Sequence, residues 1–458
     1  MSIGGIFVLQ LMAWFVAAGG DFDCITLEEF EKQSNVENDE VYKKYKEKHK
    51  EHSFLDFLYL EGEYSLYGKY DNIAIFQDDI RTNKHLKPMI SIKRYKLDNL
   101  GDNLDAEREV KTIRDLCSIR ERVVSNNYKC RRKYIANFYG CVVDIVTGKK
   151  KEEDRDKSAV YLFQEHISYS LYSQSFRSYY FGLTVVQKVG VMLDVLDKFI
   201  ELHKIDFVHS DIKPQNIITN DLDFVSFKIA GFKYAQKVGE TFMGGTMGYL
   251  APERQVQSKQ KDKLSFAEDV FSLAMTLAEI NLNISPPAKV IEYECFNNEK
   301  DLPSCEAKIF DSLENRVFTT DKELHPLLPV FKIALSFDTN IRYKTLKEFA
   351  AALLFVFSQL DGAEELAKSR HEIKKKNDPE NKFKSFWVSK VPCMTFTKSS
   401  FWRDVADSWR GGLSSPKCDE NATTVISKND DVPTDEQLAK LRKLTFDRNY
   451  TVADYKLI

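Results

Sequence analysis

The sequence predicts an α+β protein of two lobes, with a β-rich half followed by an α-rich half. Short runs of strand-forming residues lie between residues 57 and 165, and apolar residues recur at helical spacing after about residue 167. Strands and helices that are segregated along the chain are typical of the α+β class. We therefore expect a β-rich N-terminal lobe over residues 57–166 and an α-helical C-terminal lobe over residues 167–358.

Composition excludes several other classes of protein. The chain has 458 residues, of which 43% are apolar, and a formal net charge of −3. This apolar content is enough for a large core and argues against a disordered chain. The near-neutral charge argues against a nucleic-acid partner, because extended nucleic-acid binding needs a basic surface. Eight cysteines in a chain of this length do not make a disulfide scaffold.

The first 20 residues predict a targeting segment. Residues 3–18 are almost all apolar and are followed by Gly19 and Gly20, as in a secretory signal peptide, although no Lys or Arg precedes them. If it stayed uncleaved, this stretch would be just long enough to anchor the chain in a membrane, and we expect no other membrane contact. The prediction places the protein in the secretory pathway or outside the cell. The alternative is a buried N-terminal helix in a cytoplasmic protein.

The cysteines leave two interpretations open. In an oxidising compartment, the pairs Cys295/Cys305 and Cys393/Cys418 are the candidate disulfides, because their members are close in sequence. The alternative is that all of the cysteines are free thiols. The sequence contains no Cys-x-x-Cys pair, which is the spacing typical of a zinc site.

The remaining elements follow from periodicity and charge. Residues 21–56 are rich in Lys and Glu and predict a solvated helical lead-in. Residues 149–157 predict an exposed charged loop, and residues 359–458 a polar tail. We expect strands at 57–62, 72–76, 89–94, 134–146 and 159–165, and helices at 103–119, 189–203, 266–280, 324–335 and 345–360.

The segment Phe207-Val-His-Ser-Asp-Ile-Lys-Pro-Gln-Asn-Ile-Ile218 carries the chemistry. Phosphoryl transfer needs a carboxylate beside the attacking hydroxyl, a cation on the phosphoryl group and an oxygen ligand for a metal ion. Asp211, Lys213 and Asn216 supply these groups within one short loop. The pattern His-x-Asp-x-Lys-x-x-Asn resembles the catalytic loop of protein kinases, specifically the serine/threonine type. The resemblance implies that Asp211 and Lys213 are catalytic and that Asn216 is a metal ligand.

Further motifs resemble the same family in the same order, over residues 57–358. Ile90-Ser-Ile-Lys93 is similar to the strand whose lysine binds the α- and β-phosphates of ATP, and Glu109, with Glu107 as the fallback, matches the acid that orients this lysine. Residues 159–167 resemble the hinge, in which the backbone of Glu165 and His166 would receive adenine. The family resemblance thus implies ATP as a substrate and a protein as the partner.

The end of the kinase-like region also matches. Gly245-Thr-Met-Gly-Tyr-Leu-Ala-Pro-Glu253 resembles the end of the activation segment. Asp269 matches the buried aspartate of the following helix, and Arg342 matches the arginine that pairs with Glu253.

Two departures from the family pattern concern the phosphate site. In the glycine-rich loop Gly68 matches the third glycine, whereas Glu63 and Ser65 replace the first two. Gly62 either compensates for the loss of these glycines or ends a strand. Both Gly62 and Gly68 remain candidates for nucleotide binding.

The second departure is the loss of the metal-binding aspartate of Asp-Phe-Gly. Gly231 takes its place, followed by Phe232 and Lys233, and Asp223 lies too close to Asn216 to substitute for it. Mg²⁺ is normally held by one or two carboxylates plus phosphates, so the use of Mg²⁺ is in question.

Two functions therefore remain open. The first is an enzyme that transfers the γ-phosphate of ATP to Ser or Thr hydroxyls, slowly or with unusual metal dependence, as the intact catalytic loop indicates. The second is a pseudokinase that acts as a scaffold or allosteric regulator, as the losses in the glycine-rich loop and at residue 231 indicate. A plain binding domain with an empty nucleotide site is a third alternative.

Overall fold

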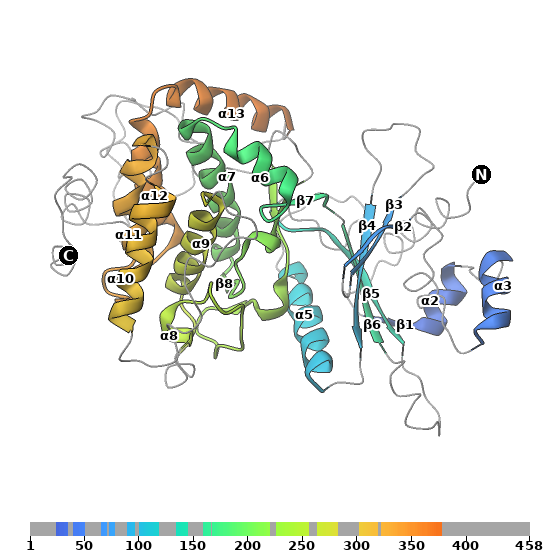
Figure 1. Ribbon diagram of the computed structural model, residues 1–458. Helices are drawn as coiled ribbons and strands as arrows, with labels where there is room; N and C mark the ends of the chain where they lie inside the picture. The colour runs from blue at the N-terminus through green and yellow to red at the C-terminus, as the bar shows by residue number, and fades with distance from the viewer. Residues whose placement is uncertain are drawn as a thin grey trace, which may run out of the picture. The chain divides into compact units, whose positions relative to one another are not determined.

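The computed structural model forms two compact units, an N-terminal unit (residues 1–168) and a C-terminal unit (residues 169–458). Strands dominate the first unit and helices the second, which confirms the predicted α+β fold class (Figure 1). The structure describes residues 24–34, 40–50, 66–70, 73–77, 89–96, 100–118, 134–144, 159–165, 167–219, 226–255, 263–282, 302–318 and 322–377. The leader at 1–20, the predicted strand at 57–62, the charged loop at 149–157 and most of the polar tail lie outside these residues. Within the described part, no helix combines the length and the apolar character that crossing a membrane requires.

The N-terminal unit is built on one six-stranded sheet. Its strand order is β1-β5-β6-β4-β3-β2, and every described pair is antiparallel except β1 with β5, which is parallel. The predicted strands at 72–76, 89–94, 134–146 and 159–165 are confirmed to within a few residues. The bounds are β1 Ile25–Thr26, β2 Leu66–Tyr70, β3 Ile73–Gln77, β4 Met89–Lys96, β5 Phe138–Asp144 and β6 Ala159–Glu165.

Helix α5 (Leu100–Ser118) packs on β4 and carries one wholly buried charge. Its buried apolar residues Ala106, Val110, Ile113 and Leu116 recur at intervals of three or four, which is the spacing of one helix face. Glu109 lies beside this face and is 1% exposed. Two further helices, α2 (Leu27–Ser34) and α3 (Glu40–Lys48), belong to the predicted charged lead-in, and α2 contacts β1 and β5.

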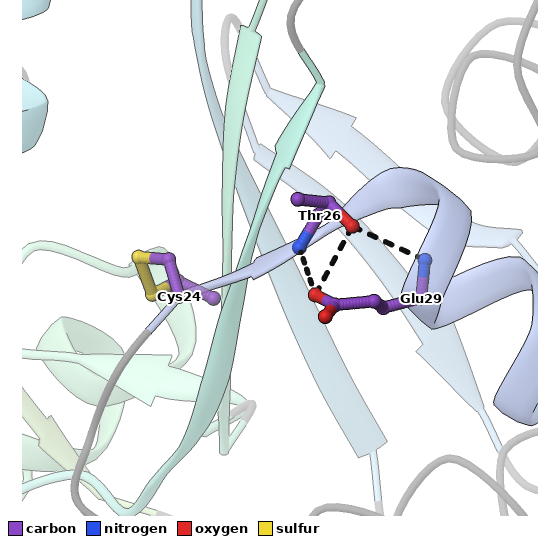
Figure 2. Close-up of a disulfide and its surroundings, with 4 residues drawn as sticks. Cys24, Thr26 and Glu29 are labelled. Carbon is purple, nitrogen blue, oxygen red and sulfur yellow. Dashed lines mark hydrogen bonds between the residues drawn. A yellow bond between two sulfur atoms is a disulfide. The ribbon is translucent and has the colours of Figure 1, made fainter.

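A disulfide between Cys24 and Cys141 joins the segment at β1 to strand β5 (Figure 2). The candidate pair Cys295/Cys305 is wrong, because Cys305 is a buried thiol that forms no disulfide. Cys393 and Cys418 lie outside the described residues. Proximity in sequence was the wrong criterion, since the bonded cysteines are 117 residues apart and meet only because β1 adds to the edge of the sheet.

The C-terminal unit is a helical body with short strands that shape its loops. Helix α7 begins with a capping box between Thr184 and Gln187, and nearly all of its residues are buried, so it forms the centre of the core together with α9 and α12. The predicted helix at 266–280 is confirmed. The longer helices are α6 Gln174–Phe181, α7 Val185–His203, α9 Phe266–Ile280, α10 Leu302–Ser312, α11 Leu328–Ala334, α12 Leu346–Ser358 and α13 Ala363–Asn377. The short elements are β7 Tyr169–Ser170, β8 Phe207–Val208, η3 Pro214–Asn216, β9 Ile217–Thr219, β10 Phe227–Ile229, η4 Phe232–Tyr234, β11 Gln236–Lys237, α8 Pro252–Gln255, η8 Leu313–Val317 and η9 Lys322–Leu327.

Helix α13 lies in the stretch that the sequence indicates as tail. It packs across one end of α7, as Figure 1 shows, with Ala367 fully buried and Arg370 3.4 Å from the buried Asp194. Gly190 of α7 permits the approach, because a Cβ atom there would lie 3.1 Å from the side chain of Leu366. The helical core therefore includes α13 as far as Arg370.

Candidate active site

Strand β4 and helix α5 place an ammonium group beside a buried carboxylate. The Nζ atom of Lys93 lies 2.7 Å from Oε2 of Glu109, and the hydroxyl of Tyr95 donates a hydrogen bond to the same oxygen. Lys93 also lies over the ring of Tyr95, 4.8 Å from its centroid. Two donors compensate the burial of the Glu109 carboxylate, and they hold the ammonium in one position. Glu107, the fallback partner, is exposed.

The other predicted nucleotide-binding residues of this unit are placed only in part. Glu165 ends β6, and its Oε2 accepts a hydrogen bond of 3.1 Å from the backbone N–H of Asn137. Gly68 lies in β2 opposite Ile75, next to a bulge in the pairing of β2 with β3. Gly62 and His166 lie outside the described residues.

In the C-terminal unit, the loop between β8 and β9 brings Asp211, Lys213 and Asn216 together. Lys213 Nζ lies 3.1 Å from Asp211 Oδ2, and Asn216 Nδ2 donates to the same oxygen at 3.1 Å and to the Asp211 carbonyl at 2.8 Å. A fourth residue joins them, since the hydroxyl of Thr246 donates to Asp211 Oδ1 at 2.5 Å and accepts from Lys213 at 2.7 Å. We call these four residues the Asp211 cluster.

Sequence reasoning did not single out Thr246 as a site residue. It lies in the Gly245–Glu253 motif, 35 residues after Asp211, and the segment that carries it passes directly against the loop. A Cβ atom on Gly245 would lie 2.3 Å from the carbonyl oxygen of Ser210, so glycine is required for this approach.

Asp269 of α9 holds the loop in a conformation that it would otherwise avoid. Ser210 has a φ of 63°, in the left-handed region that costs a non-glycine residue roughly 1–2 kcal/mol. The carboxylate of Asp269 is fully buried and accepts hydrogen bonds from the backbone N–H groups of His209 and Ser210, at 2.7 and 3.0 Å. A ring nitrogen of His203 lies 2.9 Å from the same carboxylate. These contacts compensate the strain and aim Asp211 at its partners.

His209 connects the Asp211 cluster to the segment before Gly231. Burial holds the pKa of its imidazole below the usual value, so the ring is neutral. The backbone N–H of Asp211 donates to Nδ1 at 3.2 Å, which places the proton on Nε2, and Nε2 donates to the carbonyl oxygen of Ala230 at 3.0 Å. The ring also packs against Phe199 and Phe232.

Gly231 has a left-handed backbone, with φ 80° and ψ 54°, and it adjoins the side chain of Asn216. A Cβ atom at residue 231 would lie 2.5–2.6 Å from the Oδ1, Cγ and Nδ2 atoms of Asn216. The side chain of Asn216, which is fixed by its hydrogen bonds to Asp211, therefore fills the space that a larger residue 231 would need.

The oxygen donors at this position do not fit a tightly held Mg²⁺ ion. The described residues contain no group of three or more Asp, Glu, His and Cys side chains that would suit a metal ion. The Asp211 carboxylate is already bonded to Thr246, Lys213 and Asn216, and residue 231 has no carboxylate. Mg²⁺ prefers several hard oxygen ligands in octahedral geometry, and here the described chain offers at most a carboxylate and an amide oxygen.

The predicted ion pair between Glu253 and Arg342 is present. The guanidinium of Arg342 is wholly buried and donates to both carboxylate oxygens of Glu253, at 2.7 and 3.0 Å. It also donates to the carbonyl oxygens of Ser336 and Ala267, at 2.8 and 3.3 Å. This fixes the end of the segment that carries Thr246.

A second buried acid adjoins the same segment. Glu279 of α9 accepts a hydrogen bond of 2.5 Å from the hydroxyl of Tyr249, while its other oxygen is buried without a partner among the described residues. Burial raises the pKa of the Glu279 carboxyl from 4.5 to about 7, although the Tyr249 hydrogen bond and the charge of Arg177 both lower it.

The Glu279→Gln variant is expected to reduce the dependence of stability on pH. Because the pKa of Glu279 is higher in the folded chain than in the unfolded chain, its stabilising contribution is complete below about pH 4.5 and is lost as the pH rises through about 7. Gln imitates the protonated acid, so the melting temperature of the variant should rise relative to wild type as the pH increases over this range. Thermal melts at a series of pH values measure the difference, with exposed Glu47→Gln as the matched control. Parallel curves for Glu279→Gln and wild type would contradict the prediction.

Comparisons with known proteins agree with this geometry. Residues 93–347 match the family described as protein kinase domain. A serine/threonine-protein kinase of Acanthamoeba polyphaga mimivirus is 24% identical over 207 residues, which cover 42% of this chain and 73% of the viral protein. A MAP kinase kinase of Saccharomyces cerevisiae is 26% identical over 205 residues, and a receptor-like kinase of Arabidopsis thaliana is 34% identical over 110 residues. The matched stretches cover 42% and 22% of this chain, but only 36% and 11% of those two relatives.

Proposed function

Because the chain belongs to the protein kinase family, we propose that it transfers the γ-phosphoryl group of ATP to serine or threonine hydroxyls of a protein substrate. The observation that supports this most strongly is the Asp211 cluster. There a threonine hydroxyl donates to Asp211 Oδ1 while an ammonium lies within 3.1 Å of the other carboxylate oxygen. A substrate hydroxyl needs the same two neighbours, a carboxylate to accept its proton and a cation to stabilise the phosphoryl group.

In the proposed reaction, the substrate oxygen forms a bond to the γ-phosphorus as the bond from that phosphorus to the β–γ bridging oxygen breaks. The hydroxyl proton passes to Asp211, and ADP leaves with the bridging oxygen. Lys213 stabilises charge on the transferred group, and Lys93, oriented by Glu109, binds the phosphates of ATP.

The proposal includes an unusual dependence on metal ions. A bound Mg²⁺ would neutralise phosphate charge, but at residue 231 this chain lacks the carboxylate that would hold it. The ammonium groups of Lys93 and Lys213 supply part of the same neutralisation. We therefore expect slow transfer that changes little between Mg²⁺ and Mn²⁺.

Incubation of the full chain with γ-labelled ATP and a mixture of Ser-, Thr- and Tyr-containing peptides tests the substrate class. Label on phosphoserine or phosphothreonine is the expected result. Label on tyrosine alone would contradict the assignment of the hydroxyl class.

A second candidate function, a pseudokinase that binds a protein partner without catalysis, is favoured by the contact between Gly231 and Asn216. Residue 231 lacks a carboxylate, and the side chain of Asn216 also occupies the space that a carboxylate at this position would need. A thermal-shift titration with ATP, followed by the transfer assay, separates the candidates. Stabilisation by ATP without transfer supports the pseudokinase, and no shift at millimolar ATP, with or without metal, removes nucleotide binding from both proposals.

We also propose that the protein matures in the secretory pathway. The apolar leader and the Cys24–Cys141 disulfide support this, because structural disulfides persist in oxidising compartments. Peptide mapping of the native protein without reductant should find the bridge and a chain that starts near residue 20. An intact Met1 on protein from a cytosolic fraction would overturn the proposal.

A further inference from the structure

A row of paired residues across the sheet connects the disulfide to Lys93. Lys93 in β4 lies opposite Leu162 in β6, and Leu162 lies opposite Cys141 in β5. Residues directly opposite one another project from the same face of a sheet, and neighbouring strands are about 4.8 Å apart. The disulfide therefore lies on the face that carries Lys93, about 10 Å from it across two strand spacings. Leu162 and Cys141 are each 1% exposed, so the row between Lys93 and the disulfide is buried.

A second, parallel row reaches Tyr95, the other side chain that contacts Glu109. Tyr95 lies opposite Val160, Val160 opposite Val143, and Val143 opposite Thr26 of β1. Thr26 ends β1 and immediately precedes α2, as Figure 2 shows. Its N–H and hydroxyl groups donate to Glu29 Oε2 at 2.9 and 3.0 Å, and its hydroxyl oxygen accepts from the N–H of Glu29 at 3.2 Å.

Lys93 and Tyr95, the two donors to Glu109, thus each lie at the end of a row of paired residues that begins at the segment Cys24–Glu29. This segment joins the sheet through a strand of only two residues, β1, which pairs with β5 alone. So short an edge strand has few backbone hydrogen bonds to hold it, and the disulfide supplies the permanent attachment. Without it, β5 would become the edge of the sheet, where strands open most readily.

We propose that the Cys24–Cys141 disulfide is a positioning element for Lys93. By fixing β1 against β5, it holds Leu162 and Val160 in place and so keeps Lys93 and Tyr95 in contact with Glu109. The consequence for nucleotide affinity rests on the proposed function, whereas the effect on the ion pair does not.

The test opens the bridge in the folded, full-length protein. Dithiothreitol reduces it to the Cys24 and Cys141 thiols and is itself oxidised to a cyclic disulfide, and iodoacetamide then caps the accessible thiols. A short pulse of an amine-acylating reagent follows, and mass spectrometry measures the labelling rate of each lysine. Lys93 is expected to react at least about threefold faster, because an amine released from its ion pair with Glu109 is more accessible to the reagent. Lys213, in the other unit, serves as the internal reference and should not change.

Two controls make the result specific. The double variant Cys24→Ser/Cys141→Ser should show fast labelling of Lys93 with and without dithiothreitol. Cys305→Ala, which removes a buried thiol outside the disulfide in the other unit, should respond to dithiothreitol as wild type does. In addition, the Kd for ATP should rise by at least about threefold when the bridge opens, if Lys93 binds phosphate.

Either of two results would overturn the proposal. In the first, the labelling rate of Lys93 stays the same after complete opening of the bridge. In the second, hydrogen exchange shows that β2 and β3, at the far edge of the sheet, lose their protection together with β4. The bridge would then stabilise the whole unit and not the position of Lys93 in particular. If the oxidised protein binds no ATP, the proposed function fails while the labelling result still decides this inference.

Discussion

Replacing Asp211 by Asn is expected to lower the rate of phosphoryl transfer by about 10²- to 10⁴-fold, the usual contribution of a positioned general base. The substitution keeps the shape of the side chain and removes the group that accepts the hydroxyl proton. An amide at residue 211 would also lose the ion pair with Lys213, which lies 3.1 Å from Asp211 Oδ2. Initial rates with γ-labelled ATP measure the loss.

Asp206→Asn is the matched control for this experiment. Asp206 precedes the same loop, is exposed and already has a φ of 61°, a conformation that Asn tolerates well. The phosphoryl-transfer rate of Asp206→Asn should stay within about twofold of wild type, as for most surface substitutions. If Asp211→Asn retained the rate of Asp206→Asn, Asp211 would not be the catalytic base.

Replacing Arg342 by Ala is expected to lower the free energy of unfolding of the C-terminal unit by about 3–5 kcal/mol, as when one member of a buried ion pair is removed. The side chain is 0% exposed, and its loss would leave the Glu253 carboxylate and the carbonyl of Ser336 without their donor. Arg342→Lys should recover only part of the loss, because an ammonium cannot make both hydrogen bonds to Glu253 in the same geometry.

Denaturant unfolding measures this effect, with Arg108→Ala as the control. Arg108 pairs with Asp105 across 3.7 Å, and its side chain is 31% exposed, so its loss should cost less than about 1 kcal/mol. A loss of under about 1 kcal/mol for Arg342→Ala would show that the ion pair with Glu253 is not a main anchor of this unit.

The features that the sequence predicted best are those encoded in neighbouring residues. The helix Phe266–Ile280 has an apolar pattern and a capping box at Ser265, both of which are local. The catalytic loop was recognisable because Asp211, Lys213 and Asn216 occupy one short segment. For the same reason, the predicted strands 89–94 and 159–165 agree with β4 and β6.

The features that the sequence did not predict depend on contacts between distant segments. The Cys24–Cys141 disulfide needs an edge strand of two residues, too short to have a periodic pattern. Helix α13 is mostly polar, and it packs because Gly190, on another helix, leaves room for Leu366. That Asn216 fills the space beside Gly231 follows from a left-handed backbone that no pattern of residue types reveals.

The most direct test of the central claim measures ATP binding and phosphoryl transfer in the same sample of full-length protein. ATP is added below the protein concentration, so that nearly all of it is bound, and label on Ser or Thr is followed with Mg²⁺, with Mn²⁺ and with a chelator. The proposed mechanism predicts transfer by wild type under at least one of these conditions, and its loss in Asp211→Asn. Tightly bound ATP with no transfer under any of the three conditions would contradict the proposed enzyme activity. The pseudokinase would then be the remaining candidate function.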